Sequence, residues 1–451
     1  MGHDGLSSMS FSRSTMHELR PTVRLAAPIT AGQVGQMLMG VTDTIMVGHV
    51  GTLALAACAF GNNILMIVAI AGYGVLTAVS VRVSHAHGAG ISGAMARAFY
   101  AGAGLSLIGG VLCAVGMHLI YPLFHHLGQA PGVVEEAKAY TLIVMWSLIP
   151  AWLTATARNY LDSQSRPWPA FWIMFGGVLL NVFLNWVLIF GNLGAPALGL
   201  AGAGWATLIS RVVTSVALTW FVLSCSSAPS EPWKPDRAWW REQAAVLKLG
   251  APVGLQLLSE VGAFSAAALL IGRLGAVPLA AHQIAITCAS TTFMFPLGVA
   301  MASTVRIGQA LGGGRRDLLR PIGAGAWLLG LLVMAAFTVI LIFGGAAIAR
   351  AFVSDPPVIA IAAQLLVIAA IFQLVDGVQV VGSGLLRGLH DTKVPMWINL
   401  VAYWVIALPL GAWLTFGRGE GAPGMWTGLA WGLLFAALLL VLRFVRKTRV
   451  A

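Results

Sequence analysis

Charged residues are scarce in this chain of 451 residues: its 26 Lys and Arg and 15 Asp and Glu make up only 9% of the sequence. Soluble globular domains carry about 25% charged residues, so the composition excludes that class. The four cysteines stand at no metal-ligand spacing, and the sequence lacks HExxH, GxSxG and GxxxxGK[ST]. These absences argue against a metalloprotease, a serine hydrolase and a nucleotide-binding protein, so we expect no enzyme and no cofactor.

Apolar stretches dominate what is present, because 58% of the residues are hydrophobic. About twelve stretches have the length of roughly 20 residues that spans a membrane as a helix. The first is of full spanning length with no small-residue cleavage pattern behind it, so we expect it to be retained. The sequence therefore predicts an all-α integral membrane protein with spans at 25–48, 53–78, 96–119, 137–156, 168–190, 200–224, 248–271, 279–304, 321–346, 358–383, 394–416 and 424–443.

The basic residues lie mainly on one side of these spans. If the N-terminus is cytoplasmic, 21 of the 26 fall in cytoplasmic segments, four lie outside and Arg211 lies within span six. This is a strong positive-inside signal, so the net charge of +11 records topology and not nucleic-acid binding. We expect a multi-pass protein of the bacterial inner membrane with both termini in the cytoplasm. Arg82 and Arg306, at cytoplasmic span ends, are interpreted as snorkelling anchors.

The chain contains an internal repeat with an offset of 224 residues. Pro28 matches Pro252 and Arg82 matches Arg306, in an alignment without gaps over about 60 residues. Six spans in each half predict two six-helix bundles related by a pseudo-twofold axis along the membrane normal. The expected segments are a cytoplasmic tail 1–24, an N-lobe 25–224, a cytoplasmic linker 225–247, a C-lobe 248–443 and a cytoplasmic tail 444–451.

Three acidic residues lie inside expected spans: Asp43, Glu260 and Asp376. Each costs roughly 2.5–3.5 kcal/mol at the centre of a spanning helix, and such residues usually mark a pathway for substrate, ion or proton. Salt bridges are the alternative explanation. Arg211, however, is the only basic residue deep in a span, and it cannot neutralise three acids. We therefore expect the acids to bind a mobile cation.

Helical spacing gives each acid polar or aromatic neighbours. Gln36 and Asp43 share one helix face, and Gln256, Glu260 and Phe264 form a stripe at intervals of four. Buried carboxylates of this kind can carry a proton, hold Na⁺ with hard oxygen ligands, or attract a cationic substrate beside an aromatic ring. Polar residues also occur in spans five and six, where interhelical hydrogen bonding is an equal alternative: Asn181, Asn185 and Thr207.

Five segments, in order through both halves, resemble a known family. The sequence is similar to the multidrug and toxic compound extrusion (MATE) transporters, in their bacterial NorM-like branch. The matching segments are "VTDTIMVGHVG" (41–51), "LLNVFLNWVLIFG" with "GAPALGLAGAGWAT" (179–207), "LGAPVGLQLLSEVGAF" (249–264), "LAAHQIAITCASTTFMFPLGVAMASTVRIGQALG" (279–312) and "FQLVDGVQVVGSGLLRGLHDT" (372–392).

The resemblance implies a V-shaped pair of six-helix bundles that exports organic cations or drugs in exchange for inward-moving Na⁺ or H⁺. It assigns Asp43, with Asn181, Asn185 and Thr207, to an N-lobe ion or proton site. Glu260 and Asp376 would form a C-lobe cation site able to hold Na⁺. Substrate-facing positions would be Gln36, Asp43, Gln256, Phe264, Gln283 and the loop residue Asp355.

The sequence departs from the family at two aromatic positions. Phe372 stands one turn before Asp376, where relatives often have Tyr, and Phe293 stands where a second Tyr can occur. Each departure removes a hydroxyl oxygen from the neighbourhood of the C-lobe site. This weakens the case for Na⁺ without deciding for H⁺.

Other functions remain as alternatives. A flippase of lipid-linked sugars or peptidoglycan precursors could share the architecture, but its anionic substrate would call for basic residues in the cleft. An intramembrane enzyme lacks a recognisable nucleophile, and a passive channel would not need acids that bind and release an ion. We expect a monomer that contacts membrane lipid and small organic cations and drugs.

Overall fold

The computed structural model describes residues 3–128, 130, 132–224, 229, 232 and 236–449, and every regular element in these ranges is helical. The predicted all-α class is confirmed. The elements are α1 (His3–Gly48), α2 (Thr52–Gly88), α3 (Ser92–Ile120), η1 (Tyr121–Leu127), α4 (Val133–Trp146), α5 (Leu148–Ser163), α6 (Pro167–Phe190), η2 (Asn192–Gly194), α7 (Gly199–Ser224), α8 (Arg237–Gly272), α9 (Ala276–Gly312), η3 (Arg316–Leu318), α10 (Leu319–Phe352), α11 (Pro356–Gly388), α12 (Lys393–Leu400), η4 (Val401–Ala407), α13 (Leu408–Ala412), η5 (Trp413–Gly417) and α14 (Ala422–Lys447).

Eleven of the described helical segments are long and apolar enough to cross a membrane. The first expected span, 25–48, lies in α1, and each of the other eleven falls inside one of these segments. Large apolar side chains on their outer faces stay uncovered by protein, such as Leu269 at 77% exposure and Phe343 at 85%. Such faces suit contact with lipid. The chain is therefore a multi-pass membrane protein.

The chain forms two compact units. Each unit contains the first part of the helix with which the other half begins. The N unit is Ala31–Gly254; the C unit is Met1–Thr30 together with Leu255–Ala451, so far as these are described. Consequently α1 belongs to the C unit up to Thr30, and α8 belongs to the N unit up to Gly254. These two change-over points are 224 residues apart, which is the offset of the sequence repeat.

This division differs from the expected lobes of 25–224 and 248–443 because α1 and α8 extend well beyond one span. They contain 46 and 36 residues, and 36 residues of helix measure about 54 Å, against about 30 Å for the apolar core of a membrane. Residues 3–24 of the expected tail and 237–247 of the expected linker are thus helical arms. Linker residues 225–228, 230–231 and 233–235 lie outside the described part, as do residues 1–2 and 450–451 of the two tails.

Each arm is fastened to its unit by an ion pair. In the N unit, Arg82 of α2 donates through Nε and Nη2 to the carboxylate of Glu242 on α8. In the C unit, Arg306 of α9 donates to the carboxylate of Glu18 on α1 and, at 2.7 Å, to its carbonyl oxygen. Both the arginines and the glutamates are related by the offset of 224. From the sequence, Arg82 and Arg306 are interpreted as snorkelling anchors; the structure adds that each also has a carboxylate partner within the protein.

Glycines let α1 and α8 approach their neighbours closely just beyond the arms, at Thr30 and Gly254. A Cβ atom on Gly298 of α9 would come within 2.9 Å of Cβ of Thr30, and one on Gly74 of α2 within 2.6 Å of the nitrogen of Gly254. Real Cβ atoms do not approach other atoms so closely, so only glycine fits at these two crossings. Gly74 and Gly298 are again related by the repeat offset, as are Thr30 and Gly254.

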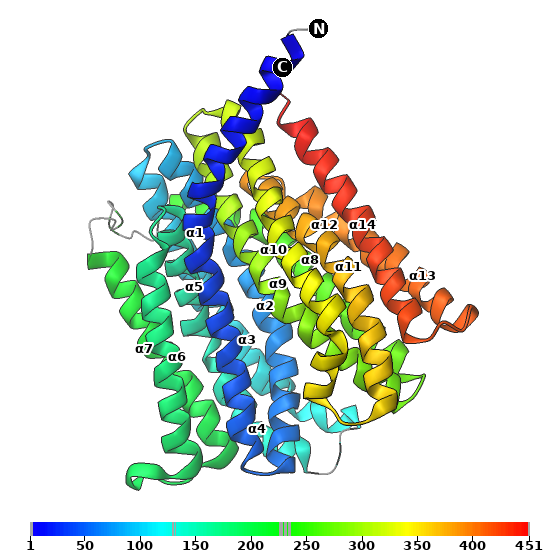
Figure 1. Ribbon diagram of the computed structural model, residues 1–451. Helices are drawn as coiled ribbons and strands as arrows, with labels where there is room; N and C mark the ends of the chain where they lie inside the picture. Colours follow the sequence, from blue (N-terminus) through cyan, green and yellow to red (C-terminus); the bar gives the residue numbers. More distant parts are fainter. Residues whose placement is uncertain are drawn as a thin grey trace. The chain divides into compact units, whose positions relative to one another are not determined.

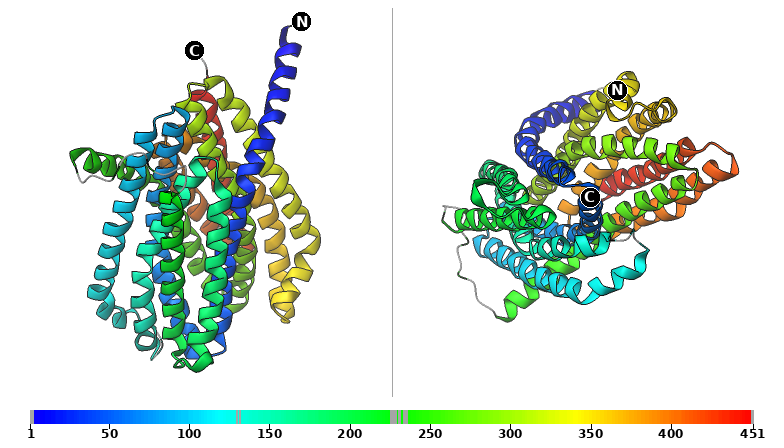
Figure 2. Two further views of the ribbon diagram at one scale, coloured as in Figure 1. Left: turned by 90° about the vertical axis from the view of Figure 1, so that its left-hand side faces the viewer. Right: turned by 90° about the horizontal axis from the view of Figure 1, so that it is seen from below.

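Within the C unit, α11 is the central helix and packs against α9, α10 and α14. The first residues of α1 and the end of α14 lie at the same end of this unit (Figures 1 and 2). Within the N unit, α2 packs against α3, α4 and α5, and α6 runs along α7. Asp376, on α11, thus lies on a helix that has neighbours on several sides.

Candidate functional site

The N unit brings Asp43 of α1 together with the two asparagines of α6. The Nδ2 group of Asn185 donates a hydrogen bond to the Asp43 carboxylate and lies 3.2 Å from Oδ1 of Asn181. Both asparagines are fully buried, because α6 turns this face toward the protein. Thr207 is also buried, on α7, which packs along α6. The grouping that the sequence suggested for these residues is compatible with this geometry.

Two further residues near this cluster were missed by sequence reasoning. Tyr140 of α4 donates its hydroxyl to Oδ1 of Asn62 on α2 at 2.8 Å, and it lies within electrostatic range of Asp43. Asn62 in turn points its Nδ2 group at Sγ of Cys58, 3.4 Å away. An Asn in the apolar run "FGNNILM" was a signal that could have identified this polar contact.

The C unit places Glu260 of α8 and Asp376 of α11 close enough for their charges to interact. Asp376 is 6% exposed and its Oδ1 atom has no hydrogen-bond partner in the described part of the chain. Glu260 is half-buried. Two neighbouring carboxylates repel each other when both are ionised, so a proton or a metal cation between them is favoured. Tyr403 of η4 lies beside both acids and was not identified from the sequence.

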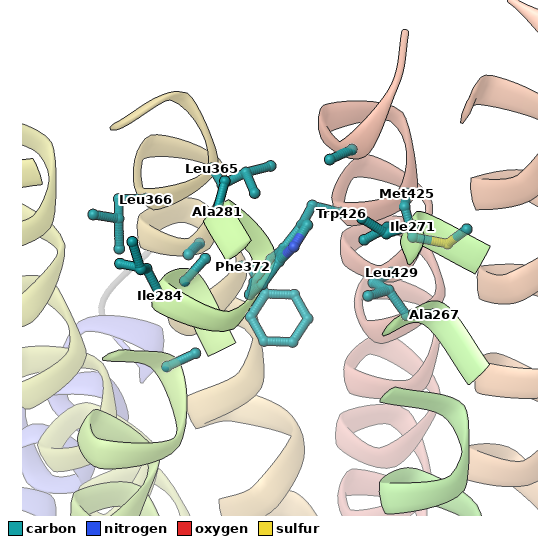
Figure 3. Packing of buried hydrophobic residues seen from close by; sticks show 14 of the residues in the cluster. Ala267, Ile271, Ala281, Ile284, Leu365, Leu366, Phe372, Met425, Trp426 and Leu429 are labelled. Atoms are coloured by element: carbon teal, nitrogen blue, oxygen red, sulfur yellow. The ribbon is translucent and has the colours of Figure 1, made fainter. Parts of the chain in front are cut away.

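Aromatic rings form a wall next to these acids. Phe264, one turn after Glu260, lies 6.1 Å from Phe372 and 6.0 Å from Tyr403, between ring centroids. Figure 3 shows Trp426 of α14 reaching toward Phe372, and their centroids are 5.7 Å apart. Edge-to-face contacts of this kind fix ring orientations. The rings therefore form a rigid apolar wall beside the two acids.

Among the described residues, none of the three intramembrane acids forms an ion pair. Five other carboxylates pair with an arginine, all of them outside the expected spans: Glu18, Asp162, Glu242, Asp391 and Glu420. Arg211 acts on Asp43 only at longer range, because its Nη1 atom donates to Ser147 Oγ at 2.7 Å. As the sequence predicted, the acids within the spans are not neutralised by basic side chains.

The remaining predicted substrate residues are spread along the helices. Gln36 on α1 and Gln283 on α9 are exposed, and Asp355 is exposed at the start of α11. The 21 residues from Asp355 to Asp376 correspond to about 30 Å of helix, so these two carboxylates cannot bind one small ligand together. Gln256 is buried and donates to Ser383 Oγ at 3.3 Å, where it joins α8 to α11.

The donor atoms suit a hard cation or a proton. The clusters offer carboxylate, amide and hydroxyl oxygens, and no three His, Cys, Asp or Glu side chains converge in the described ranges. Oxygen sets of this kind favour alkali and alkaline-earth ions over transition metals. The residues present therefore fit the expected coupling ions, Na⁺ and H⁺.

Comparison with known proteins agrees with this arrangement. The family model described as MatE matches residues 28–187 and again 252–413, and the two matches start 224 residues apart. "Multidrug resistance protein NorM" of Burkholderia vietnamiensis is 35% identical over 99% of this chain and 98% of its own length. "Probable multidrug resistance protein NorM" of Xanthomonas campestris is 37% identical over 98% and 97%.

Two solved structures have the same fold. "Crystal structure of eukaryotic MATE transporter AtDTX14" aligns with a TM-score of 0.87 at 20% identity, over 97% of this chain and 99% of that one. An outward-facing multidrug resistance MATE family transporter of the MOP superfamily aligns with a TM-score of 0.87 at 21% identity, over 96% of each chain. With both halves matched by the family model and relatives aligned over nearly the full length, the chain belongs to the MATE family of transporters.

Proposed function

We propose that the chain is a secondary active multidrug efflux antiporter, which exports organic cations and drugs in exchange for inward-moving Na⁺ or H⁺. The observation that carries this proposal is that Asp43, Glu260 and Asp376 lie in spanning helices without ion pairs in the described part of the chain. Carboxylates left in this state can bind a cation and release it again. The relatives named multidrug resistance proteins support the substrate class.

The coupling follows from competition for the same negative charge. A cation bound at Glu260 and Asp376, or at the Asp43 cluster, lowers the attraction of the site for a positively charged drug. By linkage, the drug must weaken binding of the coupling cation by the same factor. Entry of the coupling cation from outside therefore favours release of the drug to the outside. The positive-inside bias supports an orientation with both termini in the cytoplasm, in a bacterial inner membrane.

A flippase for pyrophosphate-linked lipids is less well supported. Its substrate is anionic and would need basic side chains facing it from within the membrane. Arg211, the only basic residue deep in an expected span, is bonded to Ser147 in the N unit and lies near the acid Asp43. A site dominated by acids and aromatic rings favours a cationic substrate.

The test is ethidium transport by the purified full-length protein in liposomes under separately imposed Na⁺ and proton gradients. We expect Glu260→Gln and Asp376→Asn each to lower gradient-driven transport by at least tenfold, because each removes the charge that the coupling cation needs. The matched control is Glu420→Gln, an exposed acid paired with Arg418 outside the candidate sites. Full transport by both intramembrane variants would refute the proposal.

A further inference from the structure

A π-helix interrupts the eleventh expected span. Residues Val401–Ala407 form η4, in which the chain holds one extra residue per turn relative to an α-helix. Short π-helical turns within α-helices occur frequently at functional sites, because they turn side chains away from the regular helical stripe. The side chain of Tyr403 in this segment is completely buried.

Contacts on both sides of Glu260 fasten this π-helix to α8. Nε1 of Trp404 donates to the carbonyl oxygen of Ser259 at 3.0 Å. The ring of the same tryptophan lies over Gly262, where a Cβ atom would be only 3.2 Å away. Tyr403 itself packs on Phe264. The position of Tyr403 beside Glu260 is therefore fixed by its own packing on Phe264 and by the contacts of the adjacent Trp404 with α8.

Several buried polar atoms near this site lack partners. In the described part of the chain, Oδ1 of Asp376 and both amide atoms of Gln373 make no hydrogen bond within the protein, and the hydroxyl of Tyr403 lies next to the Glu260 carboxyl. All three side chains are less than a tenth exposed. Buried polar groups without partners are costly, and in native structures they usually serve a bound ion, a water or a reaction. Gln373 lies one helical turn before Asp376.

We propose that Tyr403 is a further cation-binding residue of the C-lobe site: its hydroxyl oxygen joins the carboxylates of Glu260 and Asp376 around a monovalent metal cation, with the amide oxygen of Gln373 next to it. Tyr403 thereby supplies, from η4, a hydroxyl oxygen of the kind that Phe372 lacks on α11. The inference rests on the proposed antiport function, and it names the ion class that this site takes. A proton needs only one carboxylate, whereas Na⁺ needs several oxygen ligands at once.

The two kinds of driving ion therefore respond differently to loss of the hydroxyl. In proteoliposomes, we expect Tyr403→Phe to raise the half-saturating Na⁺ concentration for ethidium export roughly threefold to tenfold, the effect of losing one oxygen ligand comparable to a hydrogen bond. Export driven by a proton gradient alone should change less than twofold. The matched control is Tyr121→Phe, which removes an equally buried hydroxyl that donates to the carbonyl oxygen of Val134 in the N unit.

A binding measurement in detergent gives an independent readout. Na⁺ should raise the melting temperature of the wild-type protein, and Tyr403→Phe should shift this effect to higher Na⁺ concentration. If Tyr403→Phe does not fold, Gln373→Met, of similar volume and without the amide oxygen, carries the same two measurements. Unchanged Na⁺ dependence in the variant would overturn the role of Tyr403, and so would a wild-type protein whose melting temperature is indifferent to Na⁺.

The outcomes separate this inference from the proposed function. If the wild type exports ethidium but Tyr403→Phe keeps its Na⁺ half-saturation, the inference fails and the antiporter stands. If the wild type shows no gradient-driven export, yet Na⁺ stabilises it and loses this effect in Tyr403→Phe, the antiport function fails and the cation site stands.

Discussion

The ion pair between Arg306 and Glu18 should contribute more to stability than its repeat-related counterpart between Arg82 and Glu242. The side chains of Arg306 and Glu18 are 13% and 11% exposed, whereas that of Arg82 is 34% exposed. Removing one partner of a buried ion pair costs about 3–5 kcal/mol, because the other charge stays buried without compensation. Solvent screening lowers this penalty at partly exposed sites to about 1 kcal/mol.

We therefore expect Arg306→Gln to lower the free energy of unfolding by about 3 kcal/mol and Arg82→Gln by about 1 kcal/mol. The assay is unfolding in detergent by increasing SDS, followed by tryptophan fluorescence. A double-mutant cycle of Arg306→Gln with Glu18→Gln isolates the pair, with an expected coupling of about 2 kcal/mol. The pair Arg418–Glu420, whose side chains are 60% and 40% exposed, is the control and should show no measurable coupling. Equal losses at the two arginines, or no coupling in the cycle, would refute this reasoning.

Two further predictions concern the C unit and one helix of the N unit. Gly298→Ala should lower the free energy of unfolding in the same SDS assay, because its Cβ atom would overlap Thr30. The control is Gly116→Ala in α3, which has open space around it and should be neutral or stabilising. Burial disfavours ionisation of Asp391, but hydrogen bonds from two basic side chains of α14 outweigh it and lower the pKa of Asp391. Its contribution to stability is therefore present above the unfolded pKa of about 4 and is lost as the pH falls through the lower folded value. The difference in melting temperature between wild type and Asp391→Asn should be largest near pH 7 and should disappear as the pH falls below 4. A difference independent of pH would contradict this.

The spans could be predicted because their signal is local and strong. A stretch of roughly 20 apolar residues has few alternatives to a membrane helix. That Asp43, Glu260 and Asp376 have no ion pair in the described ranges could also be predicted, since the sequence offers almost no basic residue at the same depth. Both features follow from composition along the chain, with no knowledge of which helix lies beside which.

Features that depend on contacts between distant helices could not be predicted. The assignment of the α1 and α8 arms to the unit of the other half depends on Glu18 meeting Arg306 and Glu242 meeting Arg82. The repeat identifies the two arginines as a matched pair, but their glutamate partners lie in segments that the sequence predicts to be a tail and a linker. The π-helical turn that carries Tyr403 left no pattern in the sequence "VAYWVIA".

The two halves share their architecture but differ in where they place negative charge. The repeat-equivalent position of Glu260 is Gln36, and that of Asp43 is Ala267, so neither acid has an acidic counterpart. In the N unit, the carboxylate of Asp43 and the hydroxyl of Tyr140 each have an amide partner, Asn185 and Asn62 respectively.

In the C unit, by contrast, Oδ1 of Asp376 has no partner in the described part of the chain, and the hydroxyl of Tyr403 lies next to the Glu260 carboxyl. A cation that arrives at Asp43 must compete with the hydrogen bond from Asn185, whereas one that arrives at Oδ1 of Asp376 meets an oxygen atom that gains its first partner. The difference favours the C unit as the site where a metal cation binds more tightly.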